Sequence, residues 1–171
     1  MVGDTYVYGT SDIVQSWTYD RGGLLARHTD ANGHVTRTFH DAMGQPLLRV
    51  DALGYAVSWE RDAEGNVLRE IAYAQLHGGT VTDDSDPHAL IAAWARSPAD
   101  RITERTFDLN GRVLTETRRH VAYGVVDPNT GRLTEQVGDA TTAFAWDAAG
   151  TLLRKTDANG SVFQWVYDHG G

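Results

Sequence analysis

Apolar and polar residues alternate along most of the chain, in short segments that end at turn residues. Trp17 and Tyr19 flank Thr18, and the same spacing of large side chains recurs at residues 57–59 and 163–167. Alternation with a period of two is typical of a half-buried β-strand. The pattern predicts strands of about 6 to 8 residues, with aromatic side chains along one face.

Asp-x-x-Gly sequences separate these segments at a regular interval. Asp20, Asp41 and Asp62 follow one another at a spacing of 21 residues, and Asp147 and Asp168 repeat this spacing. Asp accepts hydrogen bonds from nearby backbone N–H groups and Gly takes positive φ at low cost, so the sequence suits a tight reversal between antiparallel strands. A second series of the same turns follows ten residues later, at Asp30, Asp51 and Asp157. Each unit is therefore predicted to hold two turns and two strands.

The repeats occupy about residues 14–72 and 102–171, and the segment at about 73–101 interrupts them. We predict that the chain, 1–171, is a single repeat region with a loop and a helix inserted into it.

The insertion carries the signals of one short helix. Asp86-Pro87 is typical of a helix start and Pro98 of a helix end, which predicts two to three turns between them. We expect the insertion to pack Trp94 against an edge or rim of the sheet.

Composition limits the classes of partner. The chain has 171 residues, of which 41% are hydrophobic and 22% charged, so it has enough apolar residues to fold. Its net charge of −8 repels nucleic acid and anionic membrane surfaces, and neither is a predicted partner. The longest apolar run, Ala89–Ala95, is far shorter than the roughly 20 residues of a membrane helix. No signal peptide is visible at the start of the chain, and the absence of cysteine excludes disulfides and a thiol nucleophile.

Six of the turns resemble those of the YD-repeat, or RHS-repeat, family, in which Tyr-Asp precedes two residues and a glycine. Tyr19-Asp20 and Tyr167-Asp168 carry the Tyr-Asp pair itself. Phe107 and Trp146 replace the tyrosine in two further copies, while His40 and Arg61 depart from the pattern. The resemblance assigns a structural repeat role to Tyr19, Asp20, Gly23, Asp41, Gly44, Asp62, Gly65, Phe107, Asp108, Gly111, Trp146, Asp147, Gly150, Tyr167, Asp168 and Gly171.

The resemblance implies an all-β fold, an antiparallel meander that forms a segment of a wide, spirally wound sheet or shell. Members of the family belong to secreted or surface-exposed bacterial toxins and to the animal teneurins. It implies a non-enzymatic role, in which the shell encapsulates or presents a toxin domain, and a secreted or cell-surface location. The implied partners are that toxin domain and the rest of a larger polypeptide, which we expect to continue beyond Gly171. The self-cleaving core of bacterial relatives has no match here, and we interpret Asp127-Pro-Asn-Thr-Gly131 as a lengthened repeat turn.

The aromatic residues leave a second function open. Trp17, Trp59, Trp146 and Trp165 are candidates for stacking on a ligand, as in a carbohydrate-binding or receptor-binding module. Burial of these side chains favours the structural role, and a row facing solvent favours ligand binding.

No catalytic, metal or cofactor site is predicted. Catalytic carboxylates need environments that move their pKa values apart, whereas repeated turns give the same environment to each Asp. The string Asp30-Ala-Asn32-Gly33 is similar to part of a calcium loop but lacks the closing Glu, so we interpret it as a turn. We interpret the acidic group Asp83, Asp84 and Asp86 as a solvated loop that ends in a helix cap.

Arginine recurs on the predicted strands, and we expect it to pair with acidic residues across the strands. These arginines are Arg27, Arg37, Arg49, Arg69 and Arg154.

Overall fold

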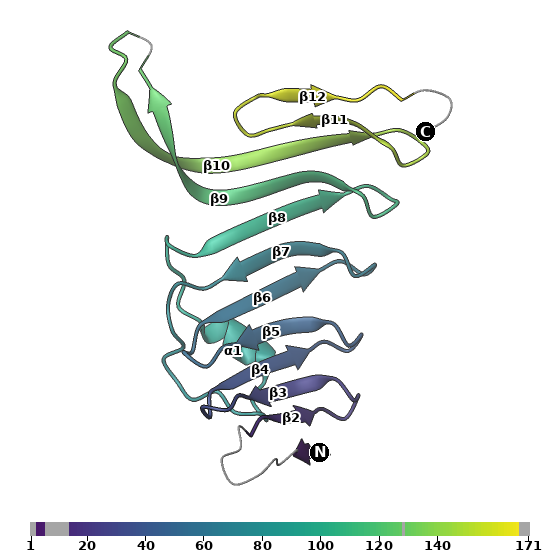
Figure 1. The fold of residues 1–171 in the computed structure, drawn as a ribbon, viewed down its shortest axis with the longest axis vertical. Coiled ribbons are helices and arrows are strands. Elements are labelled where there is room, and N and C mark those ends of the chain that lie inside the picture. The colour runs from purple at the N-terminus through teal and green to yellow at the C-terminus, as the bar shows by residue number, and fades with distance from the viewer. Residues whose placement is uncertain (1–2, 6–13, 128, 168–171) are drawn as a thin grey trace. The chain divides into compact units, whose positions relative to one another are not determined.

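The computed structural model describes residues 3–5, 14–127 and 129–167, which form twelve strands and one helix (Figure 1). The strands follow one another in a single sheet in chain order, and their pairing is antiparallel. The predicted all-β meander with one short helix is confirmed. The strands are β1 (Gly3–Thr5), β2 (Ser16–Tyr19), β3 (Leu25–Thr29), β4 (Val35–His40), β5 (Pro46–Val50), β6 (Ala56–Arg61), β7 (Val67–Ala72), β8 (Arg101–Phe107), β9 (Val113–Val126), β10 (Leu133–Trp146), β11 (Leu152–Thr156) and β12 (Val162–Gln164).

The chain divides into two compact units. Unit 1 comprises Met1–Glu60 and Ile71–Asp100, which include β1 to β5, most of β6, the end of β7 and the helix. Unit 2 comprises Arg61–Glu70 and Arg101–Gly171, which include the start of β7 and β8 to β12.

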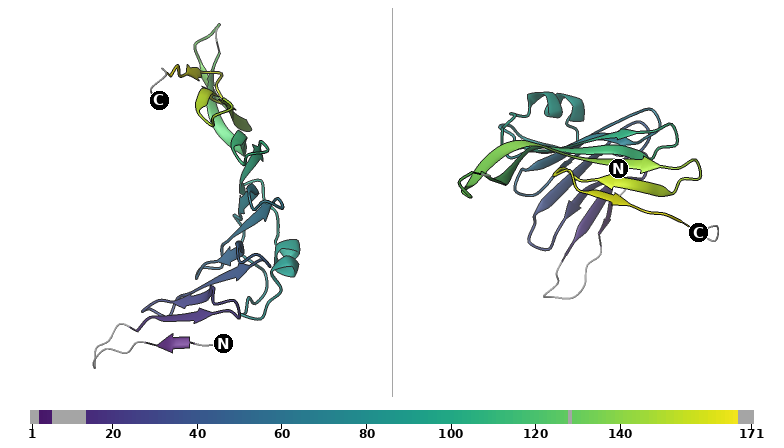
Figure 2. Two further views of the ribbon diagram at one scale, coloured as in Figure 1. Left: turned by 90° about the vertical axis from the view of Figure 1, so that its right-hand side faces the viewer. Right: turned by 90° about the horizontal axis from the view of Figure 1, so that it is seen from above.

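The helix, α1 (Pro87–Ala93), begins where the sequence predicts it. The side chain of Asp86 accepts a hydrogen bond from His88 N at 2.9 Å, and Pro87 occupies the first turn. α1 lies on one face of the strands of unit 1 and contacts β5 (Figures 1 and 2). The helix thus contacts an interior strand, while Trp94, expected at an edge or rim, packs on residues that directly follow the end of β7. No helix in the described residues is long and apolar enough to cross a membrane.

The core of unit 1 lies where the insertion meets the sheet. The Trp94 ring lies 5.2 Å from that of Tyr73 and 4.7 Å from that of His77, measured between centroids. Its Nε1 donates to the carbonyl oxygen of Gln75 at 2.8 Å, so the buried indole is satisfied. The buried hydrophobic residues of the core are Leu48, Val50, Ala56, Ile71, Tyr73, Leu90 and Trp94.

The most buried face of these strands is not the aromatic one. Thr18 and Ser58 are buried, whereas their neighbours Trp17 and Trp59 are half-buried. Ser58 Oγ lies 3.0 Å from Tyr73 Oη, so this buried hydroxyl has a hydrogen-bond partner. Alternation locates the two faces of a strand, but the insertion decides which of them is covered.

In unit 2, β9 and β10 are each 14 residues long, beyond the predicted 6 to 8. They form a hairpin that extends past β8 and β11 and curves at its far end (Figures 1 and 2). The turn predicted at Asp127 joins them: Asp127 N donates to Arg132 O at 2.9 Å, and Gly131 N donates to Asp127 O at 2.8 Å.

Candidate functional site

The repeated turn is the feature that gives the most residues a common role. In the first copy, Asp20 Oδ1 accepts hydrogen bonds from Gly22 N at 2.8 Å and Leu24 N at 2.9 Å. Gly23 N donates to Asp20 O at 3.1 Å, and Gly23 has a φ of 78°. One carboxylate oxygen therefore holds the whole turn closed, and glycine supplies the left-handed backbone.

The same bonds recur at the other repeat turns. The Oδ1 atoms of Asp41, Asp62 and Asp108 each accept from the N–H groups two and four residues later. The predicted positive φ is confirmed at Gly44, with 79°, and at Gly65, with 90°. The last predicted motif positions, Asp168 and Gly171, lie outside the described residues.

Several turn carboxyl groups have a pKa below the usual range. Bonds from the Asn66 side chain are the main cause at Asp62, and the Arg112 backbone N–H is the main cause at Asp108. At Asp147 the main cause is the Thr151 backbone N–H. Each bond favours the ionised carboxylate, so these groups are acceptors bound by their own turn and not proton donors near neutral pH.

Two of the turn glycines, Gly44 and Gly111, have a second role, because each leaves room for a side chain of the neighbouring turn. A Cβ placed on Gly44 would lie 3.1 Å from Leu24 Cδ1, and one on Gly111 would lie 3.3 Å from Asn66 Oδ1. Arg112 extends the pattern: its Nη1 donates to Asp147 O at 2.7 Å, beside Gly150. Successive turns on one edge of the sheet thus pack on one another.

In four turns of the first series, those of Asp20, Asp41, Asp108 and Asp147, the residue before the turn Asp lies at a β-bulge. Tyr19 pairs with Leu25 after a register shift, and Phe107 with Val113 in the same way. Trp146 pairs with Leu152 after a further shift, and its Nε1 donates to Val113 O at 2.8 Å. His40 has this bulge although it is not a tyrosine. The bulge explains the adjacent apolar residues after these turns, such as Leu24-Leu25 and Leu152-Leu153, a pattern that strict alternation does not produce.

The four candidate stacking tryptophans do not gather into one site. Trp17 and Trp59 belong to unit 1, and Trp146 and Trp165 to unit 2. The first three are half-buried, and Trp17 already stacks on His28 at 5.4 Å between ring centroids. Trp165 is 38% exposed.

The acidic group of the insertion has a role that the sequence did not reveal. Asp83 binds two arginines of the sheet: its Oδ2 accepts from Arg27 Nη1 at 2.9 Å, and its Oδ1 accepts from Arg37 Nε at 2.8 Å. The side chain of Asp83 is 18% exposed, so the predicted solvated loop is wrong at this residue. An insertion residue thus takes the place of the cross-strand partners expected for Arg27 and Arg37. The contact could not be predicted, because Arg27 and Asp83 are 56 residues apart and nothing local in the sequence marks it.

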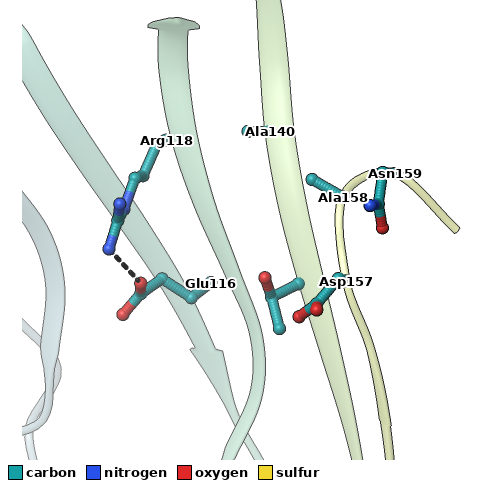
Figure 3. Close-up of a pocket in the computed structure, with 7 residues that line it drawn as sticks. Glu116, Arg118, Ala140, Asp157, Ala158 and Asn159 are labelled. Carbon is teal, nitrogen blue, oxygen red and sulfur yellow. Dashed lines mark ion pairs between the residues drawn. The ribbon is translucent and has the colours of Figure 1, made fainter. Parts of the chain in front are cut away.

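The described residues include a hollow in each unit. A cavity of about 200 Å³ in unit 1 is bordered by His40, Asp20, Arg37 and Asp83. A groove of about 340 Å³ in unit 2 lies at the foot of the long hairpin; Figure 3 shows Glu116 and Arg118 of β9 on one side of β10 and the turn after β11 on the other. Its lining is Glu116, Arg118, Ala140, Thr142, Asp157, Ala158 and Asn159.

One turn at this groove departs from the repeat. Asp157 Oδ1 lies 2.8 Å from Lys155 Nζ. The N–H of Ser161, four residues after Asp157, donates to Asn159 Oδ1 at 3.0 Å instead of to the Asp carboxylate. The groove has two acidic groups, a guanidinium and a hydroxyl, and no aromatic wall. Within the described residues, no group of three or more His, Cys, Asp or Glu side chains is arranged to hold a metal ion.

Comparison with known proteins gives a match to a repeat model over part of the chain, and a relative. Residues 19–52 match the RHS repeat. Double-stranded DNA deaminase toxin A of Burkholderia cenocepacia (strain H111) is 25% identical over 170 residues, which cover 87% of this chain and 10% of that toxin. The chain thus spans about a tenth of the length of this relative.

Solved structures of Tc toxins are also similar, although their backbones superpose on this chain with low TM-scores. The crystal structure of TcdB2-TccC3 without its hypervariable C-terminal region has a TM-score of 0.35 at 17% identity, over 91% of this chain and 10% of that one. A Photorhabdus luminescens Tc holotoxin pore gives the same TM-score, identity and coverage.

Proposed function

We propose that this chain, in which residues 19–52 match the RHS repeat, is a wall segment of a larger toxin polypeptide. In this proposal the sheet is part of a shell that encapsulates or presents a toxin domain. The chain itself is not an enzyme, and it acts outside the producing cell, in secreted or surface-bound form.

The observation that carries the proposal is the use of the turn residues. In the part of the chain that the structure describes, each turn carboxylate of the YD type binds backbone N–H groups of its own turn, and the turn glycines have positive φ. A turn repeated in this way supports an extended sheet, and it uses the Asp carboxylates as hydrogen-bond acceptors within their own turns rather than as catalytic groups. The similarity to a toxin ten times longer supports a place within a larger polypeptide.

The half-burial of Trp17, Trp59 and Trp146 favours a structural wall rather than a ligand-binding surface. Stacking on a sugar requires a ring face open to solvent. Trp17 uses its ring to stack on His28, and Trp146 stacks on Phe144 at 6.5 Å between centroids.

Limited proteolysis of the complete polypeptide tests the proposal. We expect its toxin domain to resist a protease that digests the same domain expressed alone. Gly44→Val together with Gly111→Val, which strains a turn in each unit, should remove this resistance, whereas Arg132→Ala at an exposed hairpin tip should preserve it. Equal digestion of the toxin domain in the intact polypeptide and in isolation would overturn the proposal.

A further inference from the structure

Three of the repeat turns carry the dipeptide Asn-Gly, which is prone to spontaneous deamidation because glycine has no Cβ to shield its N atom from the Asn side chain. These dipeptides are Asn32-Gly33, Asn110-Gly111 and Asn159-Gly160. We infer that Asn159 is the preferred site of this modification, and that the modification releases the β11–β12 hairpin. The modification goes beyond the proposed wall role and does not depend on it.

The reaction at Asn159 needs only water. The Gly160 N atom gives its proton to solvent base and attacks Asn159 Cγ. The bond from Cγ to Nδ2 breaks as the new N–Cγ bond forms, and Nδ2 leaves as ammonia with a proton from solvent. A water molecule then opens the resulting succinimide ring at either carbonyl. One opening leaves aspartate at position 159, and the other leaves isoaspartate.

A closed turn blocks this attack. In all three turns the Gly N–H donates to the carbonyl oxygen of the turn Asp, at 2.8–3.0 Å. An amide held in this bond cannot reach the Asn side chain, so the turn has to open before the Asn reacts. The rate of modification therefore depends on how firmly each turn is closed.

The turns at Asp30 and Asp108 are held by both oxygens of the Asp carboxylate. In each, Oδ1 accepts from the N–H groups two and four residues later, at 2.8–2.9 Å. The second oxygen, Oδ2, lies 3.1 Å from His34 Nδ1 in the first turn and accepts from Arg112 Nε at 2.7 Å in the second. These bonds protect Asn32 and Asn110.

The turn at Asp157 lacks this support. Its Oδ1 binds Lys155 Nζ at 2.8 Å, and none of the N–H groups described for this turn donates to the carboxylate. The strand that follows, β12, has three residues, and all of them are exposed. Little burial opposes the opening of this hairpin, so it opens more readily than the other two.

The Asn159 side chain is also in position for the reaction. Its Oδ1 accepts from Ser161 N at 3.0 Å, which forms an Asx turn around Gly160. This ring keeps Asn159 Cγ near the N atom that attacks it, and the Ser161 N–H stabilises the negative charge that develops on Oδ1. In the described turns at Asn32 and Asn110, the side-chain amide makes no such bond.

Isoaspartate at this position disrupts the hairpin. Asn159 is exposed and borders the groove of unit 2, so solvent reaches it (Figure 3). Isoaspartate adds one methylene to the main chain before Gly160. The two backbone bonds that close the turn, donated by Gly160 N at 2.8 Å and Asp157 N at 2.9 Å, do not fit the longer chain. β12 then loses its register with β11. The aspartate product keeps the main chain unchanged.

Deamidation rates in the 171-residue chain test the inference. The chain is incubated at pH 8, digested with pepsin in acid, and analysed by mass spectrometry with separation of the aspartate and isoaspartate peptides. Asn159 should react about tenfold faster than Asn32 and Asn110 in the folded chain. In urea the three rates should agree within about twofold, because the turns no longer differ. A rate at Asn159 no faster than the other two, or an excess that persists in urea, would overturn the inference.

Hydrogen exchange after the incubation tests the release of the hairpin. Amides of Leu152–Thr156 and Val162–Gln164 should lose protection as isoaspartate accumulates, while those of β5 and β6 keep it. Asn159→Gln retains an amide but closes the ring far more slowly, because its side chain is one methylene longer, so this variant should keep its protection. Asn32→Gln is the matched control and should lose protection as the unsubstituted chain does. Equal loss in N159Q and the unsubstituted chain, or full protection despite isoaspartate at position 159, would overturn the release.

Discussion

Unit 1 and unit 2 use the same repeat turn, yet they differ in how much apolar surface they bury. All of the described hydrophobic residues that are fully buried belong to unit 1, where the insertion covers one face of the strands. In unit 2 the hydrophobic side chains of the described residues are half-buried or exposed, including Leu133 and Val137 on the long hairpin. The repeat therefore builds a hydrogen-bonded sheet, and in the described residues the deep core forms where the insertion covers repeat strands.

This difference assigns different sources of stability to the two units. Burial of apolar surface is the main favourable term in folding, so unit 1 depends on the insertion. Unit 2 depends more on its turns and on ion pairs such as Arg119 with Glu104 and Asp139. Substitutions of matched residue types in the two units measure the contrast.

Trp94→Ala should have the largest effect. Removal of this buried indole leaves a cavity beside Tyr73 and His77, and should reduce the free energy of unfolding by about 3–5 kcal/mol. Chemical denaturation followed by circular dichroism measures the loss. The matched change in unit 2, Trp165→Ala, should cost about 1 kcal/mol or less, because that side chain is partly exposed. Equal losses would mean that the two units do not differ in how they are stabilised.

The turns could be predicted from the sequence because their chemistry is local. Asp and Gly three residues apart make the bonds that close the turn, so Asp20 and Gly23 contain nearly all the information needed. The helix start at Asp86-Pro87 is local in the same sense. The candidate stacking role of Trp165 remains a prediction.

The rest could not be predicted because it depends on distant contacts. Nothing near Asp83 indicates that Arg27 and Arg37 bind it. Alternation shows that Thr18 lies on the opposite face from Trp17, but not that the insertion covers the threonine face. The 14-residue strands of the hairpin likewise lie outside what a 21-residue period predicts.

Asp83→Ala should have the second largest effect. The change leaves two arginines of the sheet without their bridging carboxylate and weakens the attachment of the insertion to unit 1. The pair is partly exposed, so we expect a loss of about 1.5–3 kcal/mol, the range for hydrogen bonds to charged groups. Thermal melts measure it. Asp84→Ala, one residue away and exposed, is the control and should stay within about 0.5 kcal/mol; a loss as large as that of Asp83→Ala would remove the special role of Asp83.

Turn glycines should be equally important in both units, which limits the contrast between them. Gly44→Val and Gly111→Val each force a β-branched residue to a φ of about +75° to +79°, beside a side chain of the neighbouring turn. Each should cost on the order of 1–3 kcal/mol in urea denaturation. Gly33→Ala, at an open turn with nothing within 4 Å, should cost less than Gly44→Ala, since only the latter meets Leu24. A difference of several kcal/mol between Gly44→Val and Gly111→Val would show that the turns do depend on the insertion.

As the pH falls, unit 2 should lose stability at a higher pH than unit 1. The loss should be smaller than those caused by the substitutions above and should develop gradually with pH. Carboxyl groups with a lowered pKa are concentrated in unit 2, at Asp62, Asp108, Asp127, Asp139 and Asp147, whereas Asp30 is the one in the described part of unit 1 for which a lowering is resolved. A carboxyl group with a folded-state pKa below its ordinary value of 3.8 stabilises the fold above that pH, and the stability is lost as pH falls through 3.8 toward the folded-state pKa.

Hydrogen exchange at pH 5 and pH 3, corrected for intrinsic rates, measures this order of loss. Amides of β8 to β11 should lose protection at pH 3 while those of β5 and β6 retain it, because the buried apolar side chains of unit 1 carry no charge. Asp108→Asn should reduce the acid sensitivity of its own turn, since the amide oxygen still accepts from the Arg112 backbone N–H but carries no titrating proton. Simultaneous loss in both units would mean that the sheet unfolds as one cooperative body, with the buried face of unit 1 giving no local protection.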